Sequence, residues 1–157
     1  MTSPRPPERS PEETARLAAQ RMWAGDEASR SLGMELLEVG PGMATLAMTL
    51  TGAMVNGHDT AHGGFIFALA DSAFAFACNS HGEVTLAAHC SITFLRPAKA
   101  GDRLIATARE ISRFGRSGIY DVEVSVGGVT IAQFRGHSRT IGGSLVDRPG
   151  EIEHQAR

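Results

Sequence analysis

The chain is short of the features that mark secreted, zinc-binding and membrane-spanning proteins. Its 157 residues include two cysteines, Cys78 and Cys90, and no Cys-x-x-Cys pair, which argues against a disulfide framework or a zinc knuckle. The longest apolar run, residues 65–78, is too short to cross a bilayer and contains Asp71. The N-terminal segment lacks the apolar stretch of a signal peptide. We therefore expect a cytoplasmic protein with buried free thiols and no membrane partner.

The chain also lacks a large excess of charge of either sign. Lysine and arginine number 15 against 17 acidic residues, and the resulting net charge of -2 argues against a nucleic-acid partner. A hydrophobic share of 42% with 20% charged residues is ordinary for a globular protein, and the length suits one domain. We expect a disordered lead over residues 1–10, a single domain over 11–143 and an irregular tail over 144–157.

Local patterns predict one buried helix among antiparallel strands. Ser10 before Pro11 is typical of a helix start, and apolar residues at helical spacing continue to about Trp23. The segment 64–80 is apolar on nearly all sides, as in a helix buried by the rest of the fold. The other predicted elements are a helical turn at 26–31, a hairpin about 40–42, a loop at 52–64, and strands at 84–96, 102–114, 118–126 and 129–140. The order predicts an α+β domain whose antiparallel sheet curls around a central apolar helix.

The most informative stretch is NGHDTAHGGFIFALADSAFAFACNS, residues 56–80. Together with FLRPAKAGDRLIATA, GIYDVEV and FRGHSRTIGG further along, it resembles the PaaI family of hotdog-fold thioesterases. Members of that family cleave phenylacetyl-type CoA thioesters. The similarity runs from about residue 20 to residue 143. It implies the hotdog fold, an acyl-CoA substrate with an aryl or arylacetyl group, release of the free acid and CoA, and no cofactor.

The resemblance also implies roles for particular residues. Asn56, His62 and Gly63 match loop positions that line the thioester carbonyl, and Asp71 matches the helix carboxylate that acts as nucleophile or general base. Ser72 matches a neighbouring hydroxyl position that contacts the substrate. Some related enzymes carry a further hydroxyl one turn beyond the carboxylate. Alanine stands there in this chain, so the attacking water lacks that partner.

The residue types support a site of this kind on physical grounds. Gly63 and Gly64 open the predicted helix, where free N–H groups and the positive end of the helix dipole suit a developing oxyanion. Asp71 lies eight residues further on, on the order of 12 Å along the axis. One carbonyl cannot be polarised by Gly63 and attacked by Asp71 of the same helix. Two antiparallel helices from different subunits would join the two groups, so we expect a homo-oligomer in which a dimer is required. The resemblance favours a tetramer of two dimers.

Basic side chains at strand ends are candidates for the phosphates of CoA. They are Arg96, Lys99, Arg113 and Arg116. A solvated surface is the usual place for such residues, and this alternative stays open for each of them.

The same residues allow other interpretations. Asp71 could cap a buried donor, but the helix offers no basic partner for a buried charge. The pair His58 and His62 faintly echoes the zinc motif H-E-x-x-H, yet the flanking glycines favour a loop, so we predict no metal. A non-catalytic acyl-CoA sensor and a medium- or long-chain acyl-CoA thioesterase are the alternative functions. A hydratase would need an Asp–His pair that the downstream histidines do not supply.

Overall fold

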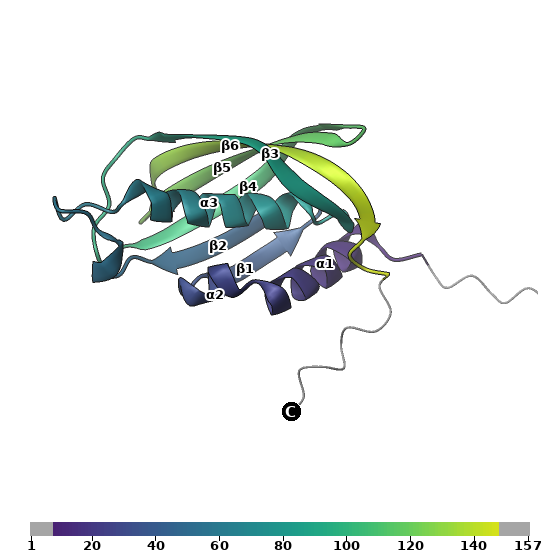
Figure 1. Cartoon of the computed structure of the whole chain (residues 1–157), viewed down its shortest axis with the longest axis horizontal. Coiled ribbons are helices and arrows are strands. Elements are labelled where there is room, and N and C mark those ends of the chain that lie inside the picture. The colour runs from purple at the N-terminus through teal and green to yellow at the C-terminus, as the bar shows by residue number, and fades with distance from the viewer. Residues whose placement is uncertain (1–7, 148–157) are drawn as a thin grey trace, which may run out of the picture.

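Six antiparallel strands arch over one long helix in the structure, a computed structural model that describes residues 8–147 (Figure 1). The elements in chain order are α1 (Pro11–Gly25), α2 (Glu27–Ser31), β1 (Glu35–Gly40), β2 (Met43–Thr49), a 3₁₀ turn (Gly52–Met54), α3 (Gly63–Cys78), β3 (Glu83–Phe94), β4 (Arg103–Phe114), β5 (Ser117–Val126) and β6 (Val129–Ser144). The predicted arrangement of a sheet around a central helix is confirmed.

The sheet has the strand order β1-β2-β4-β5-β6-β3. Its hairpins form where glycine allows the backbone to turn. Gly127 and Gly128 both have positive φ, 56° and 79°, as a tight turn between β5 and β6 requires. After α3 the chain crosses to the far side of the sheet, where β3 pairs antiparallel with β6. β3 is therefore an edge strand with one free side, beside the C-terminal strand rather than beside β2.

The helix α3 is buried because sheet side chains pack on most of its circumference. Leu69, Ala70 and Ala73 have no exposed surface, and Phe74 is 1% exposed. The Phe74 ring contacts Tyr120 of β5 and Phe134 of β6, with ring centroids 5.6 and 5.8 Å away. Burying such a side chain contributes about 1.5–3 kcal/mol.

The N-terminal helices pack against the β1 side of the sheet (Figure 1). α1 begins as predicted: the Ser10 hydroxyl accepts from the Glu13 N–H, and the Glu13 carboxylate accepts from the Ser10 N–H. The helix continues two residues past the expected end at Trp23, whose ring lies 6.0 Å from that of Phe76. Asp26 then caps α2 through the N–H of Ser29.

The last strand is longer than the sequence pattern suggested. The strand expected to end at 140 continues to Ser144, through Gly142 and Gly143 with φ of 93° and 95°. A glycine pair suggests a break in the sequence, but here the two residues bend the strand and keep it paired with β3. The Leu145 N–H then donates to the Gly82 carbonyl.

Parts of the two terminal expectations lie outside the described residues. These are residues 1–7 of the predicted disordered lead and 148–157 of the predicted irregular tail. Within the part that the structure describes, the two ends meet, because Arg9 pairs with Asp147 at 2.6 Å. None of the helices found in residues 8–147 has the length and apolar character needed to cross a membrane.

Candidate active site

The N-terminal end of α3 is capped by a histidine ring. His62 precedes the helix with φ -66° and ψ 126°, and its Nδ1 accepts from the Gly64 N–H at 3.0 Å. Because Nδ1 accepts, the ring proton lies on Nε2, which remains free to donate. Gly64 was predicted to bind substrate. In this chain its N–H donates to the His62 ring.

Gly63 offers the free donor at this helix end. Among the hydrogen bonds of the described residues, none involves the Gly63 N–H as donor. The Phe94 ring lies against this residue: a Cβ at position 63 would be 2.8 Å from Phe94 Cζ. A cavity of about 430 Å³ adjoins both residues and is otherwise lined mainly by apolar side chains, including Ile66 and Leu95. A carbonyl oxygen could reach the Gly63 N–H there and be polarised by the helix dipole.

Asn56 organises the loop that leads to this helix. Its Oδ1 accepts from the N–H groups of His58 at 2.9 Å and Thr60 at 3.3 Å. The loop also holds Asp59 at a positive φ of 55° and closes with the Val55–Ala61 bridge. Within the described chain the Asn56 amide nitrogen donates no hydrogen bond, so it is available to a ligand.

Asp71 lies half-buried near the middle of α3. Burial raises the pKa of its carboxyl group, and a hydrogen bond from Cys90 works against that rise. The Cys90 Sγ lies 3.9 Å from Asp71 Oδ1. No ion pair in residues 8–147 includes Asp71. The site therefore holds a carboxylate whose raised pKa makes it a stronger base than an exposed aspartate.

Ser72 has a different partner from the one expected. Its Oγ lies 2.8 Å from the Ser29 Oγ, and Ser29 in turn donates to Asp26 Oδ2 at 2.7 Å. Successive residues of a helix point about 100° apart, so Ser72 faces α2 rather than sharing the direction of Asp71. The hydroxyl that was predicted to contact substrate ties α2 to α3 within the chain.

The basic candidates fall at two different ends of the subunit. Arg96 borders the cavity next to Gly63, and its guanidinium donates to the Thr130 carbonyl at 2.5 Å. Lys99 lies three residues further along the same loop, and its side chain is exposed. Arg113 and Arg116 lie at the tip of the β4–β5 hairpin, on the side of the C-terminal end of α3. One chain does not bring the four together.

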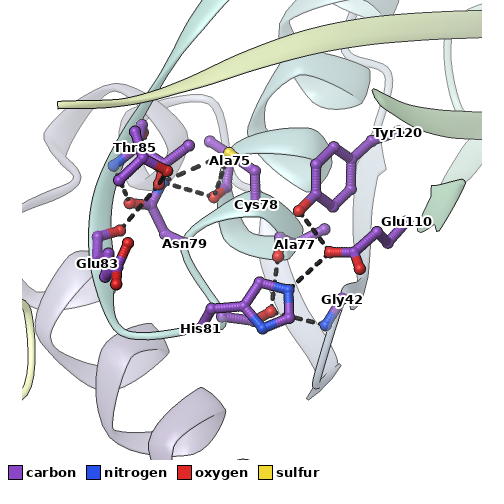
Figure 2. Close-up of polar contacts among 12 residues, drawn as sticks. Gly42, Ala75, Ala77, Cys78, Asn79, His81, Glu83, Thr85, Glu110 and Tyr120 are labelled. Carbon is purple, nitrogen blue, oxygen red and sulfur yellow. Dashed lines mark hydrogen bonds and ion pairs between the residues drawn. The ribbon is translucent and has the colours of Figure 1, made fainter. Parts of the chain in front are cut away.

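Figure 2 shows the C-terminal end of α3, where the polar side chains of Asn79, His81 and Tyr120 all have hydrogen-bond partners within the chain. Glu110 Oε2 accepts from the Tyr120 hydroxyl and lies 2.6 Å from His81 Nε2. Burial alone would raise the pKa of Glu110, but these two hydrogen bonds and the nearby positive charges hold it below its usual range. Burial and the adjacent carboxylate raise the pKa of Tyr120.

The two histidines of the H-E-x-x-H-like segment do not lie on a common helix. Residues 8–147 contain no group of three or more His, Cys, Asp or Glu side chains arranged to hold an ion. His58 and His62 lie in and directly after a loop rather than on one helical face, which is the geometry that the H-E-x-x-H motif needs.

Two contacts in the site were not predicted from the sequence. They are Cys90 with Asp71, and Phe94 with Gly63. Both Cys90 and Phe94 lie on the face of β3 that looks toward α3, as their even spacing on a strand allows. A prediction would have needed to know which strand passes over the helix.

Known proteins resemble this chain in both sequence and structure. The profile of the thioesterase superfamily matches residues 58–132. The acyl-coenzyme A thioesterase PaaI of Escherichia coli (strain K12) is 44% identical over 128 residues, which are 81% of this chain and 91% of that protein. The structure of the E. coli PaaI protein from the phenylacetic acid degradation operon has a TM-score of 0.84 at 43% identity, covering 86% of this chain and 99% of that one.

A mutant of the phenylacetic acid degradation protein PaaI from Thermus thermophilus is also similar, with a TM-score of 0.70 and 39% identity. The match covers 72% of this chain and 97% of the Thermus thermophilus chain. These similarities confirm the resemblance and the hotdog fold that the sequence motifs implied.

Proposed function

Since this chain belongs to the PaaI family of the thioesterase superfamily, we propose that it hydrolyses aryl- or arylacetyl-CoA thioesters to the free acid and CoA. The general activity, hydrolysis of an acyl-CoA thioester, rests on the 44% identity to the E. coli acyl-coenzyme A thioesterase, of which the match covers 91%. The acyl class and the roles of individual residues are inferred from the site. No cofactor is needed for this reaction, because a backbone donor and a carboxylate supply the chemistry.

Gly63 and Asp71 divide the chemical work in this proposal. The free Gly63 N–H stabilises the oxyanion that forms when the thioester carbonyl is attacked, a contribution of about 10²–10³ in rate for one such donor. Asp71 either removes a proton from the attacking water or attacks the carbonyl itself. In the first route Asp71 passes that proton on as the thiolate leaves. In the second, the carbon–sulfur bond breaks and the CoA thiolate leaves as an acyl anhydride forms on Asp71. Water then hydrolyses that anhydride to the free acid and the Asp71 carboxylate, and the proton released in this step protonates the thiolate.

His62 and Asn56 act as orienting groups. The His62 Nε2–H and the Asn56 amide nitrogen have no hydrogen-bond acceptor in the described chain, and both residues belong to the loop and cap that lead to Gly63. Each could hold the carbonyl oxygen or the departing sulfur. Arg96, which borders the cavity, and the nearby Lys99 would receive the phosphates of CoA from one subunit, whereas Arg113 and Arg116 could act at the same site only from a partner subunit.

The site requires two subunits. Gly63 and Asp71 belong to the same unbroken helix, so they are about 12 Å apart along its axis. An antiparallel partner helix would bring its own Gly63 beside Asp71. The free edge of β3 offers unpaired backbone groups for such a partner, and Asp71 contacts this strand through Cys90. We propose a two-fold dimer as the smallest active unit, with a tetramer as the expected assembly.

A CoA-release assay over aryl, arylacetyl and straight-chain acyl-CoAs tests the substrate class. We expect arylacetyl-CoA to have the highest kcat/KM, and a chelator to leave the rate unchanged. A preference for medium or long straight chains would replace the proposed acyl class, and binding without CoA release from any thioester would favour a sensor.

Complementation between two inactive variants tests the shared site. Gly63→Pro removes the N–H, and His62 already has the extended backbone that a following proline requires. Asp71→Asn removes the base. An equilibrated equal mixture contains about half heterodimers, each with one intact site of two, so about a quarter of wild-type activity should return.

The control for this experiment is Gly63→Ala. Its Cβ would displace the Phe94 ring as proline does, but it keeps the N–H. If Gly63→Ala is as inactive as Gly63→Pro, the displaced ring rather than the lost donor explains the defect. If no activity returns after subunit exchange has been verified by mass spectrometry, the two residues do not act from different subunits.

A further inference from the structure

We propose that Cys90 positions the catalytic carboxylate: its S–H holds Asp71 Oδ1 and leaves Oδ2 free to meet water or the thioester carbonyl. This inference rests on the role proposed for Asp71. The contact that carries it is the 3.9 Å approach of Cys90 Sγ to Asp71 Oδ1. In residues 8–147 no other side chain donates a hydrogen bond to this carboxylate.

The packing beneath α3 fixes the distance between the two residues. Cys90 pairs across the sheet with Gly136 of β6. A Cβ at Gly136 would lie 2.7 Å from the ring of Phe74, so the ring fills the space that the glycine leaves. Phe74 follows Asp71 by three residues, on the neighbouring turn of α3. This contact packs the Phe74 turn of α3 against β6, the strand that pairs with Cys90. It therefore keeps the Cys90 thiol within reach of the Asp71 carboxylate.

A thiol can orient a base while weakening it less than a stronger donor would. The S–H group is a weak donor, whereas a hydroxyl, imidazolium or ammonium would stabilise the carboxylate anion more and lower its basicity. Holding one oxygen restricts rotation about the Asp71 side chain, so that fewer orientations compete with the productive one. The residue type at position 90 therefore fits a positioning role better than a general-acid role.

The thiol stays protonated under working conditions. Burial and the neighbouring Asp71 charge raise the pKa of Cys90 to about 11. The group is then a donor near neutral pH rather than a thiolate nucleophile. The two roles differ in what they require, because a donor needs only to keep its proton and a nucleophile must lose it.

Other titratable groups around α3 are engaged elsewhere. Glu110 of β4 and Tyr120 of β5 pair with each other at the C-terminal end of the helix. Asp26, which precedes α2, accepts from Ser29. Cys78, on α3 itself, donates to the Ala75 carbonyl at 3.5 Å. In the described residues Cys90 is thus the titratable group that hydrogen-bonds Asp71.

The test compares the pH dependence of kcat/KM in Cys90→Ala, Cys90→Ser and Cys78→Ala with that of the wild type. Loss of the donor in Cys90→Ala should move the acid limb to higher pH and lower kcat about tenfold, with KM little changed. The hydroxyl of Cys90→Ser is a stronger donor and should move the acid limb to lower pH. Cys78→Ala is the matched control. It removes a thiol from the same region without touching Asp71, so its acid limb should stay in place even if its melting temperature falls.

A titration of the Asp71 carboxyl by ¹³C NMR separates this inference from the proposed reaction. If the Asp71 titration moves in the Cys90 variants but Asp71→Asn still hydrolyses thioesters normally, the contact exists and the reaction assignment is wrong. If Asp71 is essential but neither the titration nor the acid limb moves in Cys90→Ala and Cys90→Ser, Cys90 has no positioning role. Cys90→Ser differs by a single atom, so it keeps the test available should Cys90→Ala fold poorly.

Discussion

The two ends of α3 contrast in how their polar groups are satisfied. At the C-terminal end, Asn79 makes hydrogen bonds with the backbone of Ala75 and Thr85, and Glu110 receives both Tyr120 and His81 (Figure 2). From the loop before the helix to the middle of the helix, the Asn56 amide nitrogen, the Gly63 N–H and one Asp71 oxygen have no hydrogen-bond partner in the described chain.

Both regions adjoin the same helix, so the contrast does not reflect a difference in secondary structure. A polar network in which every member is paired fixes structure and gives a ligand nothing to bind. Donors and an acceptor that have no partner within the described chain remain available to a ligand. The presence of a histidine, a glutamate and a tyrosine at the C-terminal end is therefore a weaker sign of catalysis than one free N–H and one carboxylate.

The largest expected effect is on turnover, and it follows from a change at Asp71 near the middle of α3. Asp71→Asn should lower kcat by at least roughly a hundredfold, the lower range for a lost general base. The variant should stay folded, because within residues 8–147 the Asp71 carboxylate has one hydrogen bond, the weak one from Cys90. Steady-state CoA release at saturating substrate measures this, with the melting temperature as the check on folding. Turnover within a few-fold of wild type in the folded variant would remove Asp71 from the mechanism.

The second-largest expected effect is on the stability of the fold, and it follows from a change at the C-terminal end of α3, where the polar groups have partners. Asn79→Ala should lower the free energy of unfolding by about 2–3 kcal/mol, because it leaves the buried N–H and carbonyl of Thr85 without partners. Chemical denaturation measures this loss. The control is Ser31→Ala, which removes an exposed hydroxyl bond to a helix carbonyl and should change the free energy by less than about 0.5 kcal/mol.

Turnover per folded molecule should stay close to wild type in Asn79→Ala, since Asp71 and Gly63 keep their surroundings. A fall in kcat as large as that in Asp71→Asn would show that the two ends are not separable in the way proposed.

The smallest expected effect is on how the free energy of unfolding depends on pH, through Glu110 beside the same C-terminal end of α3. Because the pKa of Glu110 is lowered in the folded protein from its usual 4.5, its charged form adds stability that is fully present above that value. This stability is lost as the pH falls through the folded-state pKa. Glu110→Gln should therefore be less stable than wild type by about 1 kcal/mol near neutral pH, and the difference should shrink in acid.

Denaturant midpoints at several pH values between neutral and strongly acidic conditions measure this convergence. The other carboxylates with lowered pKa titrate in both proteins, so the difference between the two curves isolates Glu110. A constant difference across the whole range would show that the carboxylate charge contributes nothing.

Sequence patterns predicted the elements well where the signal lies in neighbouring residues. The Ser10 cap, the all-round apolar character of 64–80 and the Gly127–Gly128 turn each act within a few positions, and the structure confirms all three. The patterns did less well at Gly142 and Gly143, because a glycine pair has the same local preference in a bent strand as in a break.

The candidate site shows the same division. The separation of Gly63 from Asp71 follows from helix geometry alone, and so does the argument for two subunits. The involvement of Ser72 with Ser29 does not follow, because it depends on where α2 packs. Nor does the cap that His62 places on Gly64, since a histidine before a helix can turn its ring either way.

By itself the sequence determined the helices, the strands, the family motifs and the spacing of the reactive groups, because these depend on periodicity and on backbone preferences of contiguous residues. Only the tertiary structure decided that β3 lies at the edge beside β6. With that placement it put Cys90 against Asp71 and Phe94 against Gly63. Such contacts join residues 19 and 31 positions apart, and close packing of side chains across the sheet selects them rather than any local preference.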